Sequence, residues 1–154
     1  MISTLHRNLF ALLFLTSLTG AASAQPFVLV TEQEAAASRA AGGMMTPRVT
    51  SQAGGPRIEV LVPDVSKPVS APTGIEVRFV ATAPAEPRPE SFRVLYGAFK
   101  IDVTQRLLGV TKVTKDGITV SDAVLPAGTH QLFLLIADTF GRESTRVVSL
   151  SVKQ

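Results

Sequence analysis

Apolar and polar residues alternate with a period of two through most of the chain from Arg57 onward, a pattern typical of half-buried β-strands. In the first such run, Ile58, Val60 and Val62 share one face, and Pro63 then ends the strand. The pattern predicts about seven short strands, over residues 57–62, 75–79, 92–96, 110–113, 118–120, 129–138 and 145–152.

The segments between these runs contain turn-forming residues. Asp116-Gly117 predicts a hairpin between the two strands that flank it, because glycine readily supplies the positive φ that such a turn needs. Residues 139–142 predict a second turn, and the proline-rich residues 84–89 predict a loop that cannot be part of a central strand. The capping residues at the start of 102–108 predict one short helical turn.

Strands of this length and spacing indicate an all-β domain, an antiparallel β-sandwich of about seven strands over residues 57–154. Along the strand at 129–138, alternation places Leu132, Leu134 and Ile136 on one face. We expect this face to meet the core together with one face of each neighbouring strand, formed by Phe92, Val94, Tyr96, Val148, Leu150 and Val152.

Residues 25–56 lack this alternation and predict a flexible arm or linker before the sandwich. Phe27–Val30 is a short apolar run that favours a strand. Thr31 and Glu34 have the spacing of a capping box, which predicts a short helix through the alanines that follow. That helix has no large apolar side chain to bury, and two glycine pairs after it favour a flexible connection.

The first 24 residues have the three parts of a secretory signal peptide. Arg7 lies in a short polar start, an apolar run follows over residues 9–15, and Ala22-Ser23-Ala24 offers a cleavage site. The apolar run is too short to span a bilayer comfortably, so after cleavage we expect no integral membrane segment. We therefore predict that the chain is exported, either periplasmic or secreted.

Residues 125–141 follow a pattern with a family resemblance. They begin Leu125-Pro126-Ala127-Gly128-Thr129-His130-Gln131-Leu132 and continue with Leu134, Ile136, Asp138 and Gly141. This pattern resembles the E–F corner and F strand of bacterial immunoglobulin-like domains. The resemblance covers about residues 57–154 and implies an immunoglobulin-like antiparallel β-sandwich. The chain is also similar to small uncharacterised exported proteins of proteobacterial type, so the resemblance implies no activity.

The resemblance also gives His130 a place in the fold. In the tyrosine corner of such domains, a tyrosine at this position hydrogen-bonds back to the backbone. We expect the His130 ring to fill that site, with one ring nitrogen bonded to the backbone.

Composition and charge exclude several classes of function. The chain has no cysteine, so packing alone must hold the exported domain, and a lipid anchor on a cysteine is excluded. The net charge is only +3, and the basic residues are scattered, so we expect no nucleic-acid partner.

Candidate chemistry is sparse. His130 is the only histidine after the predicted cleavage site, and without cysteine or a second histidine we expect no metal site. The aspartates lie at predicted turns or strand ends, where they cap their own backbone; they are Asp64, Asp102, Asp116, Asp122 and Asp138. The chain has neither a G-x-S-x-G motif nor a phosphate-binding glycine loop. We predict no catalytic residue, no cofactor and no enzymatic activity.

One predicted surface needs an explanation. The strand at 129–138 is apolar on both faces, with Phe133 and Leu135 pointing away from the core. Together with Leu95 and Val147 they would form one apolar patch on the outer C-F-G face. The patch has three alternative covers: the arm, through residues 27–30 or Met44-Met45; the turn at 103–108; or another protein or a second copy of the chain.

The functional hypothesis from the sequence is therefore an exported, non-catalytic binding or structural module. It would contact an envelope or secreted protein, or another copy of itself, through Leu95, Phe133, Leu135 and Val147 or through its sheet edges. The alternative is binding of carbohydrate or a cell-envelope polymer through two aromatic residues in predicted loops, Phe99 and Phe140.

Overall fold

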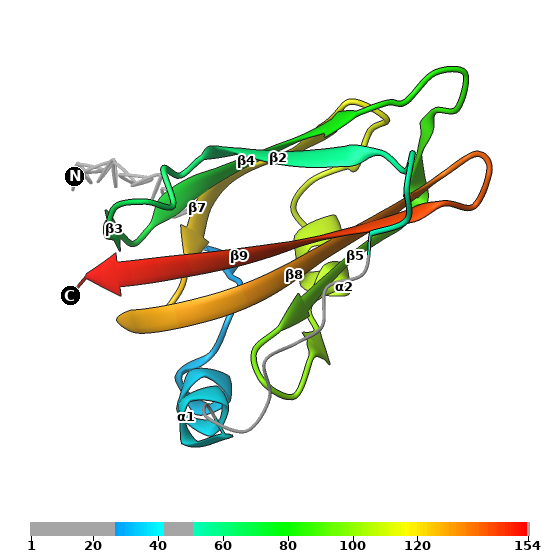
Figure 1. Ribbon diagram of the computed structural model, residues 1–154. Coiled ribbons are helices and arrows are strands. Elements are labelled where there is room, and N and C mark those ends of the chain that lie inside the picture. Colours follow the sequence, from blue (N-terminus) through cyan, green and yellow to red (C-terminus); the bar gives the residue numbers. More distant parts are fainter. Residues whose placement is uncertain (1–26, 42–50, 154) are drawn as a thin grey trace, which may run out of the picture.

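Two β-sheets make up most of residues 27–41 and 51–153, the part of the chain that a computed structural model describes (Figure 1). One sheet has the strand order β1–β7–β4–β2, and the other has the order β3–β9–β8–β5–β6. In chain order the elements are β1 (Phe27–Val28), α1 (Glu32–Ala41), β2 (Arg57–Val62), β3 (Val69–Ser70), β4 (Thr73–Val80), β5 (Pro87–Tyr96), β6 (Ile101–Asp102), α2 (Thr104–Leu108), β7 (Gly117–Val124), β8 (Gly128–Asp138) and β9 (Glu143–Lys153).

The two sheets pack face to face, and the residues predicted to point inward lie in the core between them. On β5, β8 and β9 these are Phe92, Val94, Tyr96, Leu132, Leu134, Ile136, Val148, Leu150 and Val152, all of which are buried. Phe79 of β4 meets Phe92 of β5 across the core, with ring centroids 5.3 Å apart. A mostly β fold built as a sandwich is therefore confirmed.

Two details of the predicted sandwich are wrong. The described residues contain nine strands rather than about seven, and β1–β7 and β3–β9 are parallel pairs, so the sheets are mixed. Both β1 and β3 have only two residues, too few for an alternating pattern to reveal. β3 belongs to the second sheet although β2, just before it in the chain, belongs to the first.

β5 begins earlier than predicted, inside the proline-rich stretch. Pro87 is paired with Asp138 and Arg88 with Ala137, and the register then shifts before Arg93. The prolines are tolerated because β6 pairs with β5 only at its far end, so the first half of β5 is a sheet edge.

The predicted strand at 110–113 is absent from the structure. The turn at Asp116-Gly117 does lead into β7, but before it only Thr114 forms a bridge, to Gly117. Thr111 instead donates a side-chain hydrogen bond to the Thr119 carbonyl, so this segment crosses beside β7 without a ladder.

The described part of the predicted arm lies against the sandwich. β1 adds to the edge of β7, and Leu29 and Val30 are buried in the core. The predicted capping box is confirmed: Thr31 Oγ1 accepts from the Glu34 amide at 3.3 Å, and Glu34 Oε2 accepts from the Thr31 amide at 3.0 Å. Neither helix in the described ranges is long and apolar enough to cross a membrane.

Candidate functional site

The predicted apolar patch lies on the outer face of β5, β8 and β9. Leu95 is directly opposite Phe133 in the β5–β8 ladder, and Phe133 is directly opposite Val147 in the β8–β9 ladder. Leu135 follows on the same face of β8, because alternate residues of a strand point the same way. The structure therefore brings all four predicted residues together.

Exposure differs among these four side chains. Phe133 is only 3% exposed although it lies outside the core between the sheets. Lys100 contributes to its cover, with its ammonium nitrogen 5.5 Å from the ring centroid. Leu95, Leu135 and Val147 are half-buried. What faces outward is therefore a rim of three aliphatic side chains around a buried aromatic ring.

The predicted cover by the turn at 103–108 is wrong, and so is the part of the arm's predicted cover that used residues 27–30. The segment 27–30 lies at the edge of the other sheet, and Leu29 and Val30 point into the core. In the segment 103–108, Val103 and Leu107 are likewise part of the core and do not lie over the outer face. Met44-Met45 lies outside the described residues.

Polar residues surround the apolar group. Arg93 is opposite Leu135 in the ladder, and its guanidinium lies 3.5 Å from the Asp102 carboxylate. Hydrogen bonds from Thr104, with a smaller contribution from Arg93, hold the pKa of Asp102 below its usual value. On the other side, Thr145 is opposite Leu135. An apolar centre surrounded by polar and charged residues is the usual composition of a protein-contact surface.

The two aromatic residues proposed for polymer binding are exposed but far apart. Phe99 is 65% exposed and Phe140 is 62% exposed. Phe140 lies beyond the Pro87 end of β5, whereas Phe99 follows the Tyr96 end. The length of β5 alone separates them by about 30 Å, so the two rings do not form one shared platform.

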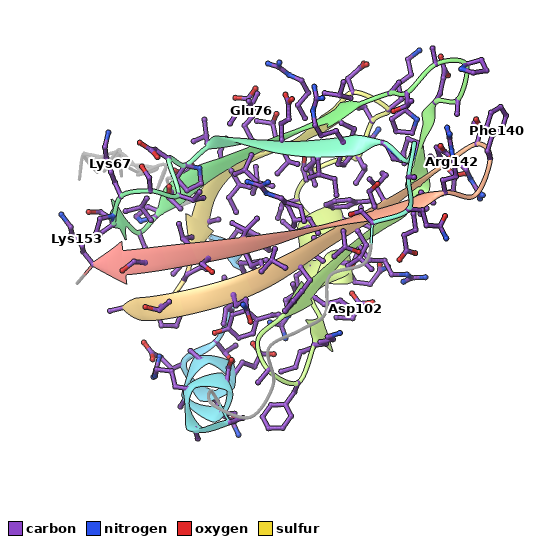
Figure 2. All side chains as sticks on the ribbon, viewed as in Figure 1. Lys67, Glu76, Asp102, Phe140, Arg142 and Lys153 are labelled. Atoms are coloured by element: carbon purple, nitrogen blue, oxygen red, sulfur yellow. The ribbon has the colours of Figure 1, made fainter. Side chains whose placement is uncertain are left out.

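Phe140 and Arg142 lie at the turn between β8 and β9 (Figure 2), and the buried carboxylate of Asp138 shapes this turn. Asp138 Oδ1 accepts from the amides of Phe140 and Arg142 at 2.9 Å each, and Oδ2 accepts from Arg142 Nε at 2.7 Å. Burial alone would raise the pKa of Asp138, but the hydrogen bonds from Arg142 and Phe140 outweigh it and lower the pKa. This aspartate caps its own turn as predicted, and so does Asp64, which accepts from the amide of Ser66.

The predicted bond from the His130 ring to the backbone is present. Its Nε2 lies 2.7 Å from the carbonyl oxygen of Pro126, and its Nδ1 lies 2.8 Å from the hydroxyl of Tyr96. Because a carbonyl can only accept, Nε2 carries the hydrogen, and Nδ1 accepts from Tyr96. Burial lowers the pKa of His130. Both ring nitrogens are occupied, which leaves neither for a metal or a substrate.

The outer face of the other sheet is polar and mixed in charge. A shallow hollow there contains Arg57, Glu59 and Arg78, and Glu59 accepts from Arg57 at 2.9 Å and lies 3.8 Å from Arg78. Lys115 and Glu86, at the same hollow, are 3.6 Å apart. These opposite charges neutralise one another, so the hollow favours neither an anionic nor a cationic ligand. Across residues 27–41 and 51–153, no group of three His, Cys, Asp or Glu side chains could hold a metal ion.

One contact was missed by sequence reasoning. Arg106 of α2 holds the Glu34 carboxylate with two hydrogen bonds, of 2.8 and 2.6 Å. The two residues are 72 positions apart, and the capping box had already given Glu34 a local role, so no sequence signal linked them.

Comparison of the chain with protein-family models, with curated proteins and with solved structures finds no match in any of the three.

Proposed function

We propose that the chain is an exported, non-catalytic binding module that contacts a protein partner through the outer face of β5, β8 and β9. The observation that carries the proposal is the apolar group on this face, in which Leu95, Leu135 and Val147 stay partly exposed around buried Phe133. Removing apolar surface from water contributes about 25 cal/mol per Å², so covering this rim favours association.

An immunoglobulin-like type for the sandwich is part of the proposal. The sheet order β2–β4–β7–β1 corresponds to strands A, B, E and D of such domains, and β5–β8–β9 corresponds to C, F and G. The bond from His130 to the Pro126 carbonyl supports the same assignment, because it reproduces the backbone contact of a tyrosine corner. β1 departs from the pattern, since it reaches the position of D from the N-terminal side of the chain.

A non-catalytic role is supported by the hydrogen bonds and ion pairs that already engage the polar side chains. His130 is fully engaged, Asp138 is bonded within its turn, and the carboxylates Glu34, Glu59 and Asp102 are each paired with a basic side chain. Export rests on the features of residues 1–24, which lie outside the described residues.

The test is capture of a partner by chemical cross-linking of the purified protein in envelope extract. Leu135→Lys and Val147→Lys place a charge on the apolar rim, and both positions are half-buried on a sheet surface, so the fold should tolerate them. Thr119→Lys is the matched control, because Thr119 is an exposed strand residue of β7, on the other sheet.

The proposal predicts one protein captured by the wild type and by Thr119→Lys, and lost in both rim variants while their circular dichroism is unchanged. Equal capture by all four proteins, or no specific capture by the wild type, would overturn it. Phe133→Lys is unsuitable as a test, because a lysine in place of that buried ring would disrupt the sheet itself.

A further inference from the structure

The chain's own N-terminal segment adds to the β7 edge of the sandwich and packs into its core. β1 runs parallel to the end of β7, with Val28 next to Val124, and the Leu29 amide donates to the Val124 carbonyl at 3.0 Å. Leu29 and Val30 are each only 1% exposed and form part of the core. An extended segment that adds to a sheet edge and buries its side chains is a recurring way of recognising a peptide.

Arg106 recognises the same segment by two different groups. Its Nη1 donates to the Leu29 carbonyl at 3.1 Å and to Glu34 Oε2 at 2.8 Å. Its Nη2 donates to Glu34 Oε1 at 2.6 Å. The guanidinium therefore binds one backbone carbonyl and one carboxylate that follows it by five residues, with the two-pronged geometry that arginine provides.

The rest of the segment contributes less. In α1 only Ala35 is buried, and one further hydrogen bond forms where Ser38 Oγ accepts from the Ala98 amide at 3.2 Å. Ala35 is part of the core and Phe27 packs against it, while the buried pair Leu29 and Val30 and the ion pair of Glu34 are the segment's strongest contacts. The surface that receives them is built from residues 94–124, by β7, α2 and the end of β5, so donor and acceptor come from separate parts of the chain.

We propose that the β7 edge, with α2 and the end of β5, is a binding site for a segment that is extended at two adjacent apolar residues and then enters a helix, whose first turn carries a carboxylate five residues after the first apolar residue. Its occupant in trans is residues 27–38 of a second copy of the chain, exchanged for the chain's own. Every contact would be identical in cis and in trans, so the partition between them depends on effective concentration, the condition under which segments exchange between copies. This site is separate from the outer face proposed above.

The first test measures binding of a labelled synthetic peptide of residues 27–38 to the purified full chain by fluorescence anisotropy. The peptide competes with the protein's own residues 27–38. Glu34→Gln should therefore have opposite effects when it is placed in the peptide and when it is placed in the protein. Placed in the peptide, it should weaken binding by about tenfold; placed in the protein, it should strengthen binding of the unaltered peptide by about tenfold. Arg106→Ala in the protein should abolish the difference between the two peptides.

Gln33→Ala is the matched control in both settings, because Gln33 is an exposed neighbour of Glu34 on α1. It should leave binding unchanged. Absence of binding to the Glu34→Gln protein, or binding that ignores Glu34 and Arg106, would overturn the proposal.

The second test identifies the occupant, using the absence of cysteine in the chain. A Val28→Cys protein is mixed with a Val124→Cys protein and oxidised; the two positions are ladder partners, at a spacing suited to a disulfide. Exchange predicts a covalent dimer of the two proteins that forms at least tenfold faster than with a Thr119→Cys partner, whose cysteine would lie exposed on the same strand. Equal rates with both partners would show random collision and contradict the exchange.

Leu135→Lys distinguishes this inference from the proposed function. It should leave peptide binding and disulfide exchange unchanged, because Leu135 lies on the outer face of the other sheet. Both proposals together predict that Leu135→Lys loses partner capture and keeps peptide binding. Retained capture would contradict the proposed function alone, and lost peptide binding would contradict this inference alone.

Discussion

The Tyr96 hydroxyl lies 2.8 Å from Nδ1 of His130, and both side chains are 1% exposed. A neutral imidazole suits this arrangement, since Nε2 donates to Pro126 and Nδ1 accepts from Tyr96. Protonation would place a second N–H against the hydroxyl in a buried site, and burial accordingly lowers the pKa of His130.

The stability of the protein should therefore fall in mild acid. The unfolded chain binds a proton at His130 near pH 6.5, whereas the native protein binds it only at a lower pH, so the free energy of unfolding decreases as pH falls below about 6.5. Urea unfolding followed by circular dichroism at pH 7.5, 6.5 and 5.5 measures this. His130→Gln should cost about 1–3 kcal/mol at pH 7.5 and flatten the dependence; an equally steep dependence in that variant would exclude His130 as its source.

The contact between Glu34 and Arg106 predicts a second pH dependence, at lower pH. Hydrogen bonds from Arg106 lower the pKa of Glu34 from 4.5 to about 2. The carboxylate thus stabilises the native protein above pH 4.5, and this contribution is lost as pH falls from 4.5 through 2. Glu34→Gln should cost about 1–2 kcal/mol at pH 7, a value reduced for the partial exposure of Arg106. In urea titrations the difference from wild type should shrink by pH 3; a constant difference would contradict the ion pair.

Gly117 lies where β7 passes closest to β4. Its φ is +147°, and a Cβ atom on it would lie 2.0 Å from the Val77 carbonyl oxygen. Gly117→Ala should therefore destabilise the protein by about 2–4 kcal/mol. The alanine is strained at this φ, and the backbone at Val77 also has to shift to make room for its Cβ atom.

Gly141→Ala separates the effect of the positive φ from the effect of the close contact with backbone. Gly141 has φ +76° with nothing near its Cβ position, so strain alone applies and the cost should be about 1–2 kcal/mol. Thermal unfolding of both variants measures the difference. Equal losses would mean that the close approach to Val77 has no energetic consequence.

Asp138 predicts a local effect at the β8–β9 turn. Asp138→Asn removes the charge from a carboxylate that accepts from two amides and from Arg142. Amide hydrogen exchange at Phe140 and Arg142 should become several-fold faster, while exchange in β7, on the other sheet, stays unchanged. Asp64→Asn, in an exposed turn far along the chain, is the control and should leave both regions unchanged.

The fold was predicted best where a strand has a long alternation of apolar and polar residues. β8 and β9 lie close to their predicted bounds, because a long alternation in Leu132–Ile136 and Val148–Val152 leaves one register for burial. β3 was not predicted because two residues carry no period, whereas the apolar run at Phe27–Val30 did indicate β1 but not its place beside β7. β5 began inside a proline-rich stretch because half of that strand is an edge, a property of the sheet order and not of its own residues.

The sequence was enough to predict which residues form the candidate site, but not how exposed each side chain is. Strand alternation and neighbouring positions were enough to group Leu95, Phe133, Leu135 and Val147 on one face. That Phe133 is buried while its neighbours are half-exposed depends on side chains from elsewhere, of which Lys100 is one. The same applies to the contact between Arg106 and Glu34, which depends on how two helices far apart in the sequence pack together.

The most direct measurement of the central claim uses a photo-reactive amino acid at position 135 in cells that produce the protein. The side chain of Leu135 is half-buried on the outer face, and Thr119 is an exposed residue of β7 on the other sheet. We expect irradiation to link one protein to position 135 and not to link it to position 119. Equal cross-linking from both positions, or cross-linking from 119 alone, would contradict the claim that the outer face of β5, β8 and β9 binds a partner.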